Sequence, residues 1–106
     1  MLKIAICDDR ADELQRLSAL AHTYIEGKKI ESEITEFQHP DELLSAIDKD
    51  NYHIYLLDMV MPMYNGIEVG MTVRRMDRHA QIIYATTEPQ YALNSFSVNP
   101  LDYLIR

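Results

Sequence analysis

The sequence is poor in residues that build several common kinds of site. It has one cysteine, Cys7, so no internal disulfide can form, and the apolar run around it favours a buried thiol in a reducing compartment. Its three glycines form no glycine-rich loop after the first apolar run, and no Gly-Lys-Ser/Thr motif occurs, which argues against nucleotide binding. The formal net charge is −7. An acidic surface repels phosphate backbones and anionic lipids, so we expect neither nucleic acid nor membrane to bind this chain directly.

Long hydrophobic runs are also absent. The N-terminal run is short and ends in two acids, so it resembles neither a secretion signal nor a membrane span, and we expect a cytoplasmic protein. The 106 residues are 47% hydrophobic and 25% charged, which is typical of one globular domain. There is no repeat and no linker rich in Gly, Ser or Pro.

Apolar runs alternate with segments of helical spacing along the whole chain. Strands are predicted at 2–7, 31–37, 54–57, 81–85 and 101–105, and helices at 11–26, from 40, after 66 and from 88 to 96. Gly27 is expected to end the first helix, and Met76 to belong to the buried face of the third. This alternation predicts an α/β fold with a parallel sheet and right-handed crossovers.

Three acids follow two of the predicted strands. Asp8 and Asp9 come after the first strand, and Asp58 comes after the third. If those strands are neighbours, the carboxylates converge at the carboxyl edge of the sheet, where α/β proteins bind ligands. Clustered carboxylates repel one another, and a hard cation such as Mg²⁺ relieves this, after which one of them can attack a phosphoryl group. The alternative for Asp8 and Asp9 is a structural one, as caps of the next helix.

The same residues resemble the receiver domain of response regulators in two-component signalling. The resemblance rests on the Asp8-Asp9 pair, the run LLDMVMPMYNG around Asp58, and Thr86 closing the fourth strand, and it spans essentially the whole chain. It implies a flavodoxin-like, doubly wound, five-stranded parallel sheet in the order 2-1-3-4-5. It also implies that a sensor histidine kinase phosphorylates Asp58.

The resemblance further implies a role for each site residue. Asp9 and Asp58 would bind Mg²⁺ directly, Asp8 mainly through water, and the main-chain carbonyl of Val60 would complete the protein ligands. Thr86 would bond the phosphoryl group through its hydroxyl, and the aromatic Tyr103 would move in response. The alternatives are that Thr86 caps the following helix and that Tyr103 is ordinary core.

The C-terminal segment narrows the resemblance. The stretch TTEPQYALNSFSVNPLDYLIR is similar to receivers of LytTR-type transcription regulators. Such a regulator would reach DNA only through an output domain, which is absent here. We interpret residues 1–106 as a receiver domain that lacks its last helix, and the sequence leaves open whether two copies form a homodimer. Arg106 stands where the family has a lysine that contacts the phosphoryl group; arginine keeps the charge but binds as a planar fork. A solvated terminal arginine is the alternative.

Three functions compete on this evidence. The first is a phosphorylation-dependent switch controlling an output such as transcription. The second is a receiver-like interaction module that phosphate does not switch, which Arg106 motivates. The third, an independent phosphatase with an aspartate nucleophile, is disfavoured because dehalogenase-type enzymes need a second acid where this chain has Val60. We therefore expect a phosphoacceptor rather than a turnover enzyme.

Overall fold

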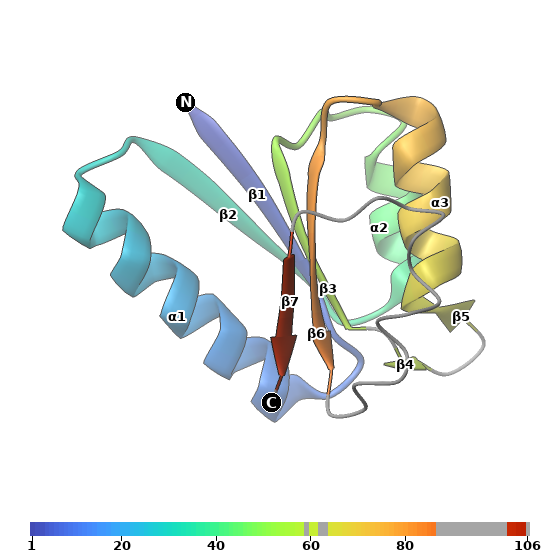
Figure 1. Cartoon of the computed structure of the whole chain (residues 1–106), viewed down its shortest axis with the longest axis horizontal. Helices are drawn as coiled ribbons and strands as arrows, with labels where there is room; N and C mark the ends of the chain where they lie inside the picture. The colour runs from blue at the N-terminus through green and yellow to red at the C-terminus, as the bar shows by residue number, and fades with distance from the viewer. Residues whose placement is uncertain (59, 62–63, 87–101, 106) are drawn as a thin grey trace.

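The structure is a computed structural model in which one parallel sheet separates two layers of helices (Figure 1). It describes residues 1–58, 60–61, 64–86 and 102–105, with the backbone alone at 60–61, 64–65, 86 and 102–105. The elements are β1 (Leu2–Cys7), α1 (Ala11–Lys28), β2 (Ser32–Phe37), α2 (Pro40–Ala46), β3 (Ile54–Asp58), β4 (Val60–Met61), β5 (Tyr64–Asn65), α3 (Gly66–Met76), β6 (Gln81–Thr86) and β7 (Asp102–Ile105).

The main sheet has five strands in the order β2-β1-β3-β6-β7, and all its pairings are parallel. Counted along the chain, these are strands 2-1-3-4-5, so the doubly wound, flavodoxin-like order is confirmed. The first strand of the chain therefore lies between the second and the third. This places the end of β1 beside the end of β3.

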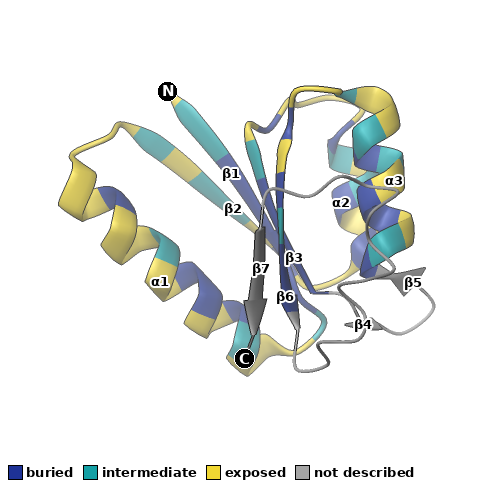
Figure 2. Cartoon of the chain, in the orientation of Figure 1, coloured by how far each residue is buried: buried dark blue, intermediate teal, exposed yellow. Residues whose placement is uncertain are grey.

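Strand alternation divides the core into two clusters, one on each face of the sheet. In β1, Ala5 and Cys7 belong to the cluster that contains Leu43 of α2 and Val73 of α3. The second cluster joins the other face of the sheet to α1, and its members are Ile4, Ile6, Leu14, Leu17, Ile25, Leu56 and Ala85. Figure 2 shows each helix burying one side and exposing the other. The central strands are apolar on both faces because helices cover both sides of the sheet.

The edge strand β2 is half exposed. Glu33 and Glu36 are exposed while Phe37 is buried. Ser18, buried on α1, donates a hydrogen bond from Oγ to Glu36 Oε2 at 2.8 Å. This bond ties α1 to the edge of the sheet that it covers.

The predicted end of the first helix is wrong. Helix α1 continues through Gly27 to Lys28, and Lys29 takes the left-handed conformation at φ 54°. The backbone N–H groups after the helix still find acceptors, because Lys29 N–H donates to Glu26 O and Ile30 N–H donates to Ile25 O. A lysine therefore occupies the terminating position that glycine fills most readily.

One expectation about the third helix and one about the segment before it also need correction. Met76 is the last residue of α3 and is half exposed, whereas Val69, Gly70 and Val73 form the buried face. The segment expected to be a loop contains the short antiparallel pair β4–β5, with Val60 opposite Asn65. The helix predicted from 88 to 96 lies outside the described residues.

Within the described part of the chain, no helix combines the length and apolar character that crossing a membrane requires.

Candidate functional site

Neighbouring strands bring the three predicted acids together at the carboxyl edge of the sheet. The register pairs Cys7 with Leu57, and Asp8 and Asp58 are the next residues along β1 and β3. The oxygens of Asp8, Asp9 and Asp58 that could bind a metal all lie within 4.8 Å of one another. The convergence expected from the sequence is therefore confirmed.

Burial differs among the three carboxylates. Asp8 is fully buried, Asp58 is 6% exposed, and Asp9 is partly exposed. Alternation along the two strands places Asp8 and Asp58 on the α1 side of the sheet, the side of Ile6 and Leu56. Asp58 is thus slightly exposed at the end of a buried strand.

Hydrogen bonds fix the loop that follows β1. The backbone N–H of Asp8 donates to Phe37 O at 3.1 Å, and Gln38 Nε2 donates to Asp9 O at 3.3 Å. Asp8 Oδ1 accepts from the backbone N–H of Arg10 at 3.0 Å. Sequence reasoning did not identify Gln38, because its partner is a backbone carbonyl 29 residues away.

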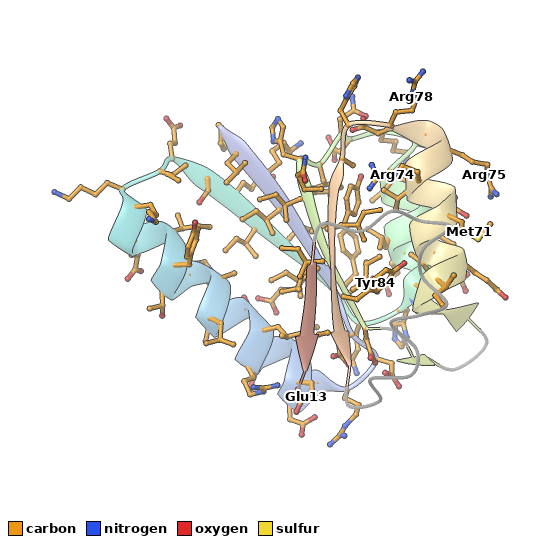
Figure 3. The ribbon with its side chains drawn as sticks, in the orientation of Figure 1. Glu13, Met71, Arg74, Arg75, Arg78 and Tyr84 are labelled. Atoms are coloured by element: carbon orange, nitrogen blue, oxygen red, sulfur yellow. The ribbon has the colours of Figure 1, made fainter. Side chains whose placement is uncertain are left out.

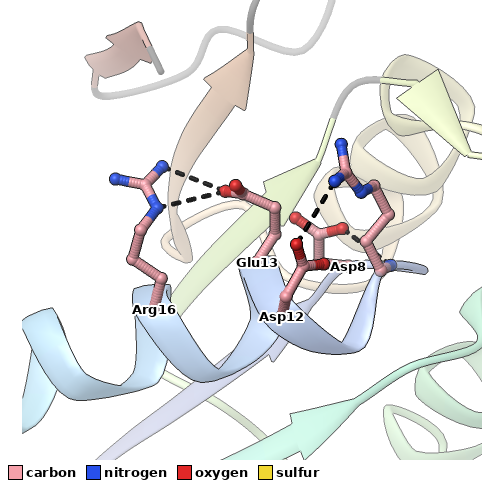
Figure 4. Close-up of polar contacts among 5 residues, drawn as sticks. Asp8, Asp12, Glu13 and Arg16 are labelled. Atoms are coloured by element: carbon pink, nitrogen blue, oxygen red, sulfur yellow. Dashed lines mark hydrogen bonds and ion pairs between the residues drawn. The ribbon is translucent and has the colours of Figure 1, made fainter.

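The helix-cap alternative for Asp8 holds only in part. The N-cap residue of α1 is Arg10, and it makes no side-chain capping bond. Asp8 instead binds the backbone N–H of that residue, so its carboxylate shapes the entry to the helix from two residues upstream. Figure 4 shows this contact beside the ion pairs Arg10–Asp12, which is exposed, and Glu13–Arg16, which is partly exposed. Surface pairs of this kind contribute little to stability.

The negative charges of the three carboxylates also affect the pKa of the neighbouring Cys7 thiol. Desolvation by burial, and then the charges of Asp8, Asp58, Asp9 and Glu42, raise the pKa of Cys7 from 9.0 to about 12. The thiol is fully buried and stays protonated at neutral pH, which agrees with the structural role expected from the sequence.

The donor set fits a hard divalent cation. Two oxygens bound directly to Mg²⁺ at about 2.1 Å lie at most about 4.2 Å apart. The limit of 4.8 Å among the three carboxylates is close to that separation. The three carboxylates therefore form a compact donor set of the kind that a hard cation binds. Carboxylate oxygens are also the ligands that Mg²⁺ prefers.

The other predicted site residues are described only in part. Thr86 ends β6 one residue beyond Ala85, which is the register partner of Asp58, so its backbone lies at the same edge of the sheet. Tyr103 lies in β7 opposite Tyr84, and the backbone of Val60 lies in β4. The side chains of Val60, Thr86 and Tyr103, and the whole of Arg106, lie outside the described part of the structure.

This fold and site define a class of signalling protein. Residues 4–105 match the response regulator receiver domain family, and the chain belongs to this family. Receiver domains are signalling domains of two-component systems. The sensory transduction protein LytT of Bacillus anthracis is 31% identical over 106 residues, which cover 100% of this chain and 42% of that protein. The transcriptional regulatory protein LytR of Staphylococcus aureus (strain N315) is 36% identical over 74 residues, 70% of this chain and 30% of that protein.

These relatives support the resemblance to LytTR-type regulators. The chain spans less than half the length of either. Among solved structures, the response regulator protein TrrA from Thermotoga maritima, in complex with Mg²⁺-BeF, aligns with a TM-score of 0.84 at 24% identity. The alignment covers 100% of this chain and 87% of that one, and it supports the fold.

Proposed function

We propose that this chain is a phosphorylation-dependent switch in which Asp58 accepts a phosphoryl group from a sensor histidine kinase. The observation that carries the proposal is the gathering of the Asp8, Asp9 and Asp58 carboxylates within 4.8 Å at the ends of adjacent strands. Membership of the receiver family supports the same role.

The chemistry needs only one nucleophile from the protein. An Asp58 carboxylate oxygen attacks phosphorus, the bond from phosphorus to the donor's leaving atom breaks, and an acyl phosphate forms. When Mg²⁺ is bound, it neutralises the charge that collects on the phosphoryl oxygens. Asp9 and Asp58 would hold the ion directly, Asp8 would hold it through water, and the carbonyl of Val60 would complete the protein ligands.

The proposed response to phosphorylation involves the remaining predicted residues. The Thr86 hydroxyl would bond the phosphoryl group, Arg106 would contact its oxygens, and Tyr103 would move as Thr86 is drawn in. The position of the Thr86 backbone at the same edge as Asp58 supports its part in this. The added charge would thereby change the surface around β7 and the helix predicted from 88 to 96.

Labelling with acetyl phosphate and Mg²⁺ tests the phosphoacceptor. The wild-type chain should gain one acid-labile phosphoryl group, measured by intact mass, and Asp58→Asn should gain none. Asp48→Asn removes an exposed acid that is not part of the cluster and serves as the matched control. Equal labelling of wild type and Asp58→Asn would contradict the proposal.

The sequence motivates a second candidate, an interaction module that phosphate does not switch. The observation in its favour is Arg106 in place of the family's lysine. Titration with Mg²⁺ separates the two, because no binding at millimolar concentration together with no labelling would favour the second.

We further propose that residues 1–106 are the receiver domain of a longer, cytoplasmic transcription regulator that reaches DNA through an output domain. The larger length of the curated relatives and their printed functions support this. Independent turnover is not expected, because Val60 stands where an aspartate phosphatase needs its second acid. Sustained hydrolysis of a generic phosphomonoester, lost in Asp58→Asn, would contradict that. Sedimentation before and after labelling would decide whether copies form a homodimer.

A further inference from the structure

A buried hydrogen bond joins β6 to the start of α3. The phenolic hydroxyl of Tyr84 donates to the carbonyl oxygen of Gly66 at 2.9 Å, across 18 residues of sequence. Tyr84 is fully buried, and Gly66, the first residue of α3, is buried as well. Figure 3 shows the Tyr84 side chain pointing from β6 toward α3.

The two ends of this bond belong to the segments that border the acid cluster. Tyr84 is the register partner of Leu57, and the next pair along the same two strands is Ala85 with Asp58. Gly66 ends the segment that begins at Asp58 and contains the β4–β5 pair. The hydroxyl therefore links the strand that ends at Thr86 to the far end of the segment that follows Asp58.

Packing alone does not require a hydroxyl at this position. The Tyr84 ring belongs to the apolar cluster between the sheet and helices α2 and α3, where a phenylalanine ring would fill the same space. A buried phenol hydroxyl needs a hydrogen-bond acceptor. Here the acceptor is Gly66 O, so the bond constrains the distance between β6 and the first turn of α3. The oxygen atom thus supplies a positional constraint that the ring does not.

We propose that Tyr84 is a positioning residue for phosphoryl transfer. Its hydroxyl holds Gly66 at the start of α3 in a fixed relation to β6, so that these two elements keep their relative placement while Asp58 reacts. This inference rests on the proposed function of Asp58. Small displacements of reacting groups reduce rates strongly, so a constraint one strand away can affect the reaction without touching it.

The variant Tyr84→Phe removes the constraint and keeps the ring. Tyr55→Phe is the matched control, because Tyr55 is also buried in this cluster and lies on the adjacent strand β3. We expect the labelling rate of Tyr84→Phe at saturating acetyl phosphate and Mg²⁺ to fall about fivefold, the equivalent of roughly 1 kcal/mol. Tyr55→Phe should label at the wild-type rate, even where urea unfolding shows a similar loss of stability in both variants.

A labelling rate of Tyr84→Phe at or above that of Tyr55→Phe overturns the inference. Wild-type protein carrying tyrosine labelled with ¹³C at Cζ gives a second test that needs no stable variant. Addition of Mg²⁺ and beryllofluoride should leave the Tyr84 signal at the position of a bonded hydroxyl, and a shift to the position of an unbonded tyrosine also overturns the inference. If wild-type Asp58 is not labelled at all, the proposed function itself fails, and this outcome is distinct from the others.

Discussion

The backbone N–H of Arg10 donates a hydrogen bond of 3.0 Å to the carboxylate of Asp8, two residues before it. One fully buried side chain therefore shapes the loop between β1 and α1 and also faces Asp9 and Asp58. The two roles of Asp8 depend on different properties, because the hydrogen bond in the loop needs an oxygen acceptor and the metal site needs a negative charge. Substitutions at Asp8 can therefore separate the two roles.

The variant Asp8→Asn should keep the loop and lose the metal. Asparagine can present its side-chain oxygen to Arg10 N–H, and it removes one of three repelling charges, so the free energy of unfolding without Mg²⁺ should match or exceed that of wild type. Asp8→Ala removes the acceptor as well and should be less stable than Asp8→Asn by about 1 kcal/mol. Urea unfolding measures both. Equal stability of the two variants would show that the Arg10 contact contributes nothing.

Magnesium should stabilise the folded chain by mass action. At ten times its dissociation constant, an ion that binds only the native state adds about 1.4 kcal/mol to the free energy of unfolding. Thermal unfolding with MgCl₂, against NaCl at matched ionic strength, measures this gain. Asp58→Asn should lose most of it, while Asp48→Asn, which removes an exposed acid outside the cluster, should keep it. A gain of equal size in NaCl would show general screening instead of a site.

The Cys7 thiol should make stability depend on alkaline pH. Its pKa is about 12 in the folded state against 9.0 for an ordinary thiol, so the unfolded chain releases this proton at lower pH than the native one. The stabilising contribution is complete below pH 9.0 and is lost as pH rises toward 12. Cys7→Ala, which leaves a small void, should be less stable than wild type by about 1 kcal/mol at neutral pH.

The difference between wild type and Cys7→Ala is the informative quantity, because other groups that titrate in the same range are common to both. Urea unfolding should show this difference shrinking across the alkaline window. A constant difference would mean that the folded thiol titrates as it does in the unfolded chain. Alkylation of native wild-type protein should be slow at neutral pH and fast in urea, since the thiol is fully buried.

The end of α1 offers two stabilising substitutions. A Cβ added at Gly27 meets nothing within 4 Å, so Gly27→Ala should stabilise the chain by about 0.5–1 kcal/mol through helix propensity. Lys29 holds a left-handed conformation that glycine adopts without strain, so Lys29→Gly should stabilise as well, by up to about 1 kcal/mol. Thermal unfolding measures each variant. Lys28→Gly, inside the helix, is the control and should destabilise.

The alternation of apolar runs with segments of helical spacing made much of the fold predictable. The runs around Ile6 and Leu56 are apolar on both faces because helices cover both sides, and that pattern needs no tertiary information. The meeting of Asp8 with Asp58 depended on an order of strands taken from related proteins, because periodicity does not say which strands are neighbours. Once β1 lies beside β3, the position of both acids at the strand ends follows directly.

The features that the sequence did not predict are determined by tertiary contacts. Glycine is the residue expected at a helix end, but the end of α1 is decided by which carbonyls the N–H groups of Lys29 and Ile30 reach. Tyr84 belongs to an apolar run, so its hydroxyl looks incidental until Gly66 lies within 2.9 Å. Such contacts join residues far apart in sequence and leave no local pattern.

The central place of the first strand also bears on how the chain is made. β1 leaves the ribosome before both of its neighbours in the sheet, and the second of these, β3, is complete only at Asp58. Until then one edge of an apolar strand has no partner, and exposed edges of this kind recruit other chains. Nascent chains that stop before Ile54 are therefore the ones most in need of chaperones.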